Sequence, residues 1–399
     1  MKIIDMKCAV IGDNPIVRII TDEGISGYGE GEYFKPFLKP FVLHFKDAIM
    51  GEDPTDVERV MLRIRKRGAF KPWGAAISMI EHALWDIAGK AAGVPVYKLL
   101  GGKVRDQVRV YNGAIRTEMT STNPEDYAKA AQQMKDLPHG FSFVKMGVGF
   151  HSPMKDQVAD FHYGDKTDPN PFHGFTTSGL ITERGMNHMI DCVAAIKDVL
   201  GDEVGLALDC GPGFTAIDAL KFARAVEPFN LMWLEDMITG DYTPWVNADV
   251  YHDVTHATTT PIHTGEQIYL RQNFKSLIEG HAVNVIGPDP CDVGGLAEIK
   301  WIAEYADLHG IMMAPHGTGN GLLGLAALVQ VCATMPQNYI GFELPTGKPD
   351  WWFDIVDGLP DPLVKDGMIK VWDRPGMGVE LNADRTQPYL KEDDKDFFE

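Results

Sequence analysis

The chain has 399 residues, of which 45% are hydrophobic and 23% charged, and its formal net charge is −19. This composition is that of an ordinary globular protein of two or three domains, and the negative charge argues against a nucleic-acid partner. The five scattered cysteines give no zinc framework, and no apolar run has the length of a signal-peptide core or a membrane span, so we expect a cytoplasmic protein without a membrane partner.

Residues 1–110 are predicted to form a compact α+β unit. The stretch "IVRIIT", the turn Asp22-Glu23-Gly24 and "ISGYGEGE" indicate a β-hairpin. The stretch "AAISMIEHALWDIAGKAAG" has apolar residues on one face at helical spacing, and the following Gly-Val-Pro ends the helix.

From about residue 108, short apolar runs alternate with amphipathic helices. The runs are "VRVYNG", "FSFVKMG", "EVGLALD", "NLMWLED", "TPIHTGE", "AVNVIGPD", "GIMMAP" and "YIGFEL". Alternating strands and helices imply a parallel sheet, and eight such units indicate a closed (β/α)₈ barrel of the TIM type, which we place at residues 111–350. The long loop at 150–185 follows a barrel strand and is either an active-site loop or an oligomer contact. Residues 351–399 are expected to return to the N-terminal unit, with a frayed end.

Ionisable residues end six successive runs, about one βα unit apart. In a barrel, the carboxyl ends of the strands meet at the face where catalytic residues converge. Any one of these residues alone could be a solvated loop group, but the ordered series favours a functional site. The six are Asp209, Glu235, Glu266, Asp289, His316 and Glu343.

Carboxylates that converge at a barrel mouth repel one another and lose hydration, so they need a cation. Oxygen ligands favour a hard ion, and Mg²⁺ is the natural choice. Asp289 and His316 end neighbouring strands, so the carboxylate can orient the imidazole as a general acid or base. Lys145, at the tip of the second strand, could neutralise a substrate carboxylate, act as a base, or simply reach solvent at the rim.

In the order and spacing of its motifs, the chain resembles the enolase superfamily, in the mandelate racemase subgroup. The motifs are "IEHALWDIAGKAAGVPVYKLLGG", "ALDCGPG", "WLED", "TPIHTGEQ", "GPDPCDVGGLAEIKWIA", "APHGTG" and "GFELP". The resemblance implies a modified barrel with a capping domain built from both termini, and Mg²⁺ bound by Asp209, Glu235 and Glu266. It also implies abstraction of the proton α to a carboxylate by the Asp289–His316 dyad, with Glu343 bonded to the substrate carboxylate or its enediolate.

Two positions depart from the family pattern. Many members carry Lys-x-Lys on the second strand, but Gly147 replaces the second lysine here, and some sugar-acid dehydratases have a histidine where this chain has Gly211. With no visible base opposite His316, we expect an acid-sugar dehydratase in which His316 both removes the α-proton and protonates the β-hydroxyl. This syn elimination would give a 2-keto-3-deoxy acid.

Substrate specificity is predicted to come from two loops of the N-terminal unit, "YGEGEYFKPF" and "KRGAFKPWGA", and from the 150–185 loop. Their candidates could contact the hydroxyls of a small acid sugar or close the site, and each could equally be an ordinary surface or cap residue. We also expect a homo-oligomer, as is usual in the family. The candidates are Lys35, Arg67, Lys71 and Trp73.

Three other functions fit parts of the sequence. A racemase, epimerase or cycloisomerase would share the metal site and the enediolate. A nicotinamide-dependent dehydrogenase would use the G-x-G-x-x-G pattern of Gly319, Gly321 and Gly324, although only one strand candidate follows it. A non-catalytic binding protein would keep only the fold, whereas the ionisable series is intact.

Overall fold

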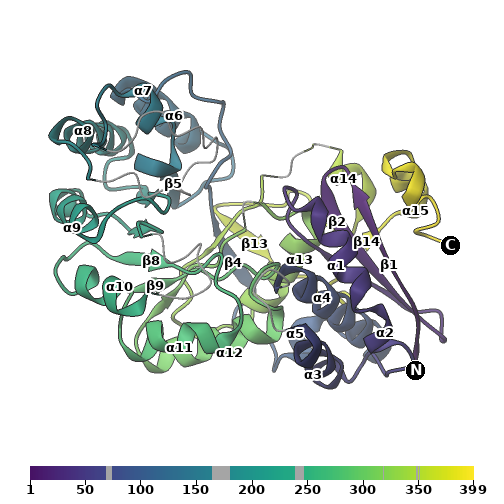
Figure 1. The fold of residues 1–399 in the computed structure, drawn as a ribbon. Helices are drawn as coiled ribbons and strands as arrows, with labels where there is room; N and C mark the ends of the chain where they lie inside the picture. The colour runs from purple at the N-terminus through teal and green to yellow at the C-terminus, as the bar shows by residue number, and fades with distance from the viewer. Residues whose placement is uncertain (69–73, 164–179, 239–246, 318, 347–348, 350) are drawn as a thin grey trace.

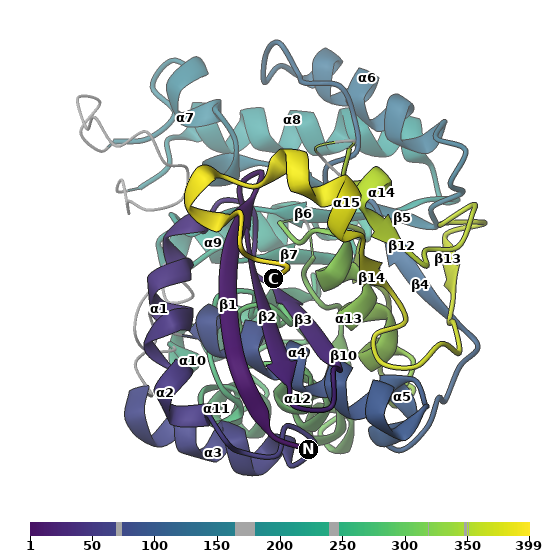
Figure 2. The same cartoon turned by 90° about the vertical axis from the view of Figure 1, so that its right-hand side faces the viewer.

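The computed structural model describes residues 1–68, 74–163, 180–238, 247–317, 319–346, 349 and 351–399 (Figures 1 and 2). An N-terminal unit of sheet and helices lies beside a barrel of parallel strands. In both views the C-terminal end lies against the strands of the N-terminal unit. Among the described residues, no helix is long and apolar enough to cross a membrane.

The N-terminal unit is built on a three-stranded antiparallel sheet in the order β1 (Ile3–Ile11), β2 (Asn14–Thr21) and β3 (Ser26–Glu30). The pairing of β2 with β3 confirms the predicted hairpin. The predicted helix forms as α4 (Gly74–Ala92), whose apolar face is buried against this sheet. The other elements are η1 (Pro36–Leu38), α1 (Lys39–His44), α2 (Lys46–Ile49), α3 (Val57–Gly68) and α5 (Val96–Leu99).

All eight predicted runs form barrel strands, in the predicted order. They are β4 (Gln107–Tyr111), β5 (Phe143–Gly147), β6 (Gly205–Asp209), β7 (Trp233–Glu235), β8 (Ile262–Thr264), β9 (Val285–Ile286), β10 (Met312–Met313) and β11 (Phe342–Glu343). Strands β5 to β10 form one parallel sheet, and β11 pairs in parallel with β4. Single bridges from Asn112 to Val144 and from Met313 to Tyr339 close the ring, which confirms the barrel.

Helices connect successive strands and cover the outside of the barrel. Three of them begin at a side chain that accepts a backbone N–H of the first turn, namely Asn123, Thr182 and Thr215, and such caps fix where a helix starts. The longer helices are α6 (Pro124–Lys135), α8 (Glu183–Leu200), α9 (Ala216–Ala225), α10 (Ala248–Thr255), α11 (Arg271–Glu279), α12 (Leu296–Leu308) and α13 (Leu322–Cys332). Short turns are η3 (Gly149–His151), α7 (Met154–Gln157) and η4 (Glu227–Phe229).

Large aromatic side chains fill part of the barrel interior. Tyr111 stacks on Phe143 with ring centroids 4.8 Å apart, and Trp233 meets both rings edge-on. All three side chains are buried. This packing holds the ends of β4, β5 and β7 in place, and two of these strands carry predicted site residues at their tips.

The C-terminal segment departs from the prediction in two places. Its strand β13 (Met368–Lys370) pairs antiparallel with β4 of the barrel, whereas the following residues do return to the N-terminal unit, with the backbone N–H of Met377 donating to Asp86 of α4. The end of the chain is not frayed, because Phe397 is buried and its carbonyl accepts a hydrogen bond from Arg18 of β2. The remaining elements are α14 (Trp352–Ile355), β12 (Val356–Asp357), β14 (Glu380–Leu381), α15 (Ala383–Thr386), η6 (Gln387–Tyr389) and η7 (Glu392–Asp394). The domain boundaries themselves stay a prediction.

Candidate active site

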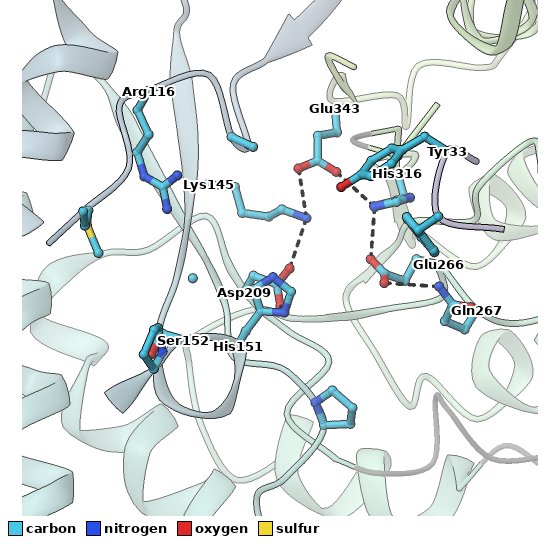
Figure 3. Close-up of a pocket in the computed structure, with 18 of the residues that line it drawn as sticks. Tyr33, Arg116, Lys145, His151, Ser152, Asp209, Glu266, Gln267, His316 and Glu343 are labelled. Carbon is cyan, nitrogen blue, oxygen red and sulfur yellow. Dashed lines mark hydrogen bonds and ion pairs between the residues drawn. The ribbon is translucent and has the colours of Figure 1, made fainter. Parts of the chain in front are cut away.

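A cavity of about 620 Å³ lies at the carboxyl ends of the barrel strands (Figure 3). The strand-end residues that line it are Lys145, Asp209, Glu266, His316 and Glu343. Glu235 and Asp289 are fully buried behind them. Tyr33 and Phe34, in the loop after β3, also line the cavity, so the N-terminal unit forms part of its wall.

Lys145 lies among the carboxylates of the cavity. Its Nζ donates to Glu235 Oε1 at 2.5 Å and lies 3.3 Å from Glu343 Oε1 and 3.5 Å from Asp209 Oδ2. Burial alone would lower the pKa of Lys145, but the charges of Glu235 and Glu343 outweigh it and hold the pKa well above its ordinary value. As an ammonium in this position, Lys145 could bind an anion that enters the cavity.

The three predicted metal ligands lie close together. One oxygen each of Asp209, Glu235 and Glu266 lies within 4.8 Å of the other two, and all three side chains are buried. Burial raises the pKa of Glu235, and the charges of Asp209 and Glu266 add to this rise while Lys145 opposes it. Buried carboxylate oxygens in such a group are the donor set that a hard divalent cation prefers, so these residues fit a metal ion.

His316 and Asp289 form a close pair. His316 Nδ1 lies 2.7 Å from Asp289 Oδ2, and Asp289 also accepts hydrogen bonds from the backbone N–H of Cys291 at 2.6 Å and from Asn320 Nδ2 at 3.1 Å. These bonds fix the carboxylate, which in turn orients the imidazole and leaves Nε2 for chemistry.

The other ring nitrogen of His316 faces two further acids. His316 Nε2 lies 3.4 Å from Glu266 Oε2 and 3.4 Å from Glu343 Oε2. Burial alone would lower the pKa of His316, but the charge of Glu266 and the hydrogen bond with Asp289 hold it well above its ordinary value. The arrangement places the imidazole of His316 next to the predicted metal ligands.

Lys35, a predicted substrate contact, is engaged elsewhere. Its Nζ lies 2.5 Å from Glu32 Oε2 and 2.6 Å from Asp292 Oδ2, and it is not among the residues that line the cavity. Glu32 also approaches the dyad, with Oε1 3.9 Å from His316 Nδ1. These ion pairs favour a positioning role for Lys35.

The other three predicted contacts cannot be placed. Lys71 and Trp73 lie outside the described residues, and so does the side chain of Arg67. Residues 164–179 of the long loop also lie outside them. The substrate contacts of this group stay a prediction.

Two cavity residues, Arg116 and His151, were not singled out from the sequence, although His151 lies in the 150–185 loop. Arg116 follows β4, and its buried Nε has no hydrogen-bond partner among the described residues. His151 ends η3, and its Nδ1 lies 3.3 Å from Asp209 Oδ1. Both follow the carboxyl end of a predicted strand, so a search that extended from the strand tips into the next few residues would have found them.

The glycine-rich turn before α13 binds a carboxylate of the protein itself. Glu30 Oε2 accepts hydrogen bonds from the backbone N–H groups of Leu323 and Gly324, each at 2.9 Å. A Cβ at Gly321 would lie 1.8 Å from Glu30 Oε1. These amides are the ones that a dinucleotide phosphate would need, so the arrangement argues against the nicotinamide-dependent alternative.

The chain is similar to curated enzymes and to solved structures along almost its full length. It is 32% identical to a D-xylonate dehydratase of Haloferax volcanii over 98% of this chain and 89% of that protein, and 29% identical to a D-galactonate dehydratase of Variovorax paradoxus over 92% and 89%. A mandelate racemase/muconate lactonizing enzyme-like protein of Rubrobacter xylanophilus superposes with a TM-score of 0.81 at 31% identity, covering 98% of each chain. The 3,6-anhydro-D-galactonate cycloisomerase of Zobellia galactanivorans superposes with a TM-score of 0.79 at 25% identity, covering 98% of this chain and 100% of that one.

Two family models account for most of the sequence. The model for the N-terminal domain of mandelate racemase and muconate lactonizing enzyme matches residues 10–101. The model for enolase C-terminal domain-like proteins matches residues 126–385, which is more than half of the chain. The chain therefore belongs to the mandelate racemase / muconate lactonizing enzyme family of the enolase superfamily.

Proposed function

We propose that this protein is a Mg²⁺-dependent dehydratase of acid sugars. The observation that carries the proposal is the group of Asp209, Glu235 and Glu266 beside the His316–Asp289 pair in one cavity. The relatives named as D-xylonate and D-galactonate dehydratases support the reaction class.

In this proposal, Asp209, Glu235 and Glu266 hold the Mg²⁺. When bound, the ion would supply positive charge that stabilises the negative charge developing on the substrate carboxylate and offsets the charge of Glu266 beside His316. Lys145, whose Nζ lies within 3.5 Å of Asp209, Glu235 and Glu343, is proposed to bind the same substrate carboxylate as an ammonium. Glu343, 3.3 Å from Lys145 Nζ, lies where it can bond to that group when protonated.

His316 is proposed as the base that removes the α-proton. Asp289 bonds to Nδ1 and sets the tautomer in which Nε2 accepts a proton. Loss of the β-hydroxyl from the enediolate then gives a 2-keto-3-deoxy acid after the enol ketonises. Arg116 and the cap residues Tyr33 and Phe34 line the remaining cavity wall and are proposed to face the polyol chain.

The test is a screen of aldonic and aldaric acids with Mg²⁺, scored by a 2-keto-acid assay and beginning with D-xylonate and D-galactonate. We expect one or a few sugar acids to yield a 2-keto acid, and the activity to vanish with EDTA and return with Mg²⁺. Absence of a 2-keto acid across the whole screen would refute the proposal. A cytoplasmic location and a homo-oligomeric state stay predictions from the sequence.

A racemase, epimerase or cycloisomerase is the second candidate, because one cycloisomerase superposes on this chain and another is 25% identical to it in sequence. Incubation in heavy water separates the two. A racemase or epimerase would exchange the α-proton of its substrate without releasing a 2-keto acid, whereas a dehydratase couples the exchange to loss of water. His316→Asn should abolish exchange in either case, and exchange that persisted in this variant would exclude His316 as the base.

A further inference from the structure

His151 is a cavity residue to which the proposed function gives no role. It ends the short turn η3 after β5, and 47% of its side chain is exposed. The imidazole lines the same cavity as His316. Figure 3 shows it beside Asp209, on the side of the cavity away from His316.

The position of His151 is fixed by the structure around it. Its backbone N–H donates to the carbonyl of Cys210 at 3.0 Å, at the end of β6. The preceding residue, Phe150, is buried and meets Phe161 and Phe214 edge-on, with ring centroids 5.9 and 5.3 Å away. The imidazole is therefore presented by an anchored turn and does not sit on a free loop.

Two glycines make room for this turn. A Cβ at Gly147 would lie 2.6 Å from the carbonyl oxygen of His151 and 2.9 Å from its ring Cδ2. A Cβ at Gly211, where φ is +62°, would lie 2.7 Å from the backbone nitrogen of His151. These are the two positions at which the chain lacks the bases expected from its family resemblance, and a side chain at either would displace His151.

We propose that His151 is a second catalytic residue, the acid that protonates the departing β-hydroxyl while His316 acts as the base. The assignment rests on the proposed dehydration and replaces the expectation that His316 serves in both roles. Asp209, 3.3 Å from Nδ1, can accept one ring N–H, and no bond joins Nε2 to another described residue.

The step balances in atoms and electrons. The α C–H bond breaks and its proton goes to His316. The β C–O bond breaks with its electron pair on oxygen, and the proton from His151 completes a water molecule. A double bond forms between the two carbons, and the enol then takes a solvent proton at the β-carbon and releases its hydroxyl proton to give the keto acid.

The experiment compares two substrates in the Mg²⁺-loaded protein, the best aldonate of the screen and its 3-deoxy-3-fluoro analogue. Departure of fluoride needs less help from an acid than departure of hydroxide. In His151→Asn we expect dehydration to fall by at least about 100-fold while fluoride release stays within about threefold of the wild type. His316→Asn should lose both reactions, because both need the α-proton removed.

A purely supporting role of His151 predicts different results. If the imidazole only orients Asp209, its removal should weaken Mg²⁺ binding by about 10- to 100-fold and slow both substrates alike. Calorimetric titration with Mg²⁺ alone measures this directly. Equal losses on the two substrates, weakened Mg²⁺ binding, or an unchanged rate of dehydration would each overturn the inference.

A second variant and a control show whether a loss of activity in His151→Asn comes from misfolding. Gly147→Ala keeps the imidazole but pushes it aside, so it should also lose dehydration more than fluoride release. His252→Asn changes a histidine whose side chain is likewise 47% exposed but lies on α10, outside the cavity lining, and should leave both rates unchanged. A wild type that dehydrates no sugar acid would overturn the proposed function and this inference together, whereas an active wild type with a fully active His151→Asn overturns the inference alone.

Discussion

Buried carboxylates gather in two regions of the molecule, around the cavity and between the N-terminal unit and the barrel helices. At the second region, Glu30 accepts the first backbone amides of α13, and Glu81 of α4 accepts those of α12 at 2.8 and 2.9 Å. The acids around the cavity instead face one another, and three of them share the ammonium of Lys145.

Because their partners differ, the buried carboxylates of the two regions have different roles. Amides at a helix start replace water around a carboxylate and stabilise its charge, so Glu30 and Glu81 join the two parts of the fold. Crowded carboxylates destabilise one another even where single donors reach them, and they attract a cation. Burial alone therefore does not identify a functional acid, whereas the identity of its partners does.

Glu235→Gln should produce the largest effect, because it removes one acid from the cavity group. We expect kcat to fall by at least about 10³-fold, since a metal ligand is lost. The free energy of unfolding should change little, because relief of repulsion among the buried carboxylates offsets the loss of the charge that Glu235 presents to Lys145. The 2-keto-acid assay and urea unfolding measure the two quantities. An active but less stable variant would remove the distinction between the regions.

Glu30→Ala tests the opposite region. Two backbone amides and Asn14 Nδ2 would lose their acceptor, and we expect the free energy of unfolding to fall by about 4 kcal/mol. The folded fraction should keep its kcat, because Glu30 is not among the residues that line the cavity. Urea unfolding checks the first claim. Glu203→Ala, which changes an exposed acid, is the control and should have little effect.

The stability of the Glu81 region should depend on pH. Burial raises the pKa of Glu81 from 4.5 to about 7, against the opposing effect of its backbone hydrogen bonds. Because the folded pKa is the higher one, the stability that protonation adds is fully present below 4.5 and is lost as the pH rises through about 7. Relative to Glu81→Gln, the wild type should lose about 3 kcal/mol across this window. The urea midpoints of the wild type and Glu81→Gln at four pH values from 4.5 to 7.5 give this difference in stability. Midpoints that changed with pH in parallel for the two proteins would contradict the prediction.

Arg116→Met should have the smallest effect of the four. The guanidinium lies in the cavity wall away from the carboxylate group, and its Nε has no partner among the described residues. We expect KM for the sugar acid to rise by about tenfold with little change in kcat, as for loss of one hydrogen-bonding group to the polyol chain. Steady-state kinetics with the best aldonate measures both. A fall in kcat at constant KM would place Arg116 nearer to the reacting atoms.

The barrel and the location of the site were predictable because strand ends are local features of the sequence. A run such as "GLALD" shows both the strand and the residue at its tip, and parallel strands bring such tips to one face. The structure brings Asp209, Glu235, Glu266 and His316 together, while their roles stay predictions.

The rest of the site depends on contacts between distant segments. His151 reaches Asp209 only because its turn folds over Gly211, and no local pattern indicates that contact. The sequence around Lys35 does not show its ion pair with Asp292, because the two residues lie 257 positions apart in the chain. The antiparallel pairing of β13 with β4 also joins segments that are far apart in the chain, and strand propensity does not determine which strands pair.

The ion pairs of Lys35 also bear on how new substrate preferences could arise in this protein. Lys35 lies in the same loop as Tyr33 and Phe34. It forms an ion pair with Asp292, which lies three residues after Asp289 in the chain. Replacing this loop with one that lacks the lysine would leave Asp292 buried without its cation and would disturb the residue that orients His316. The loop that carries Lys35 and the turn at 289–292 therefore depend on each other. We expect an exchange of this loop to preserve activity only when both segments are exchanged together.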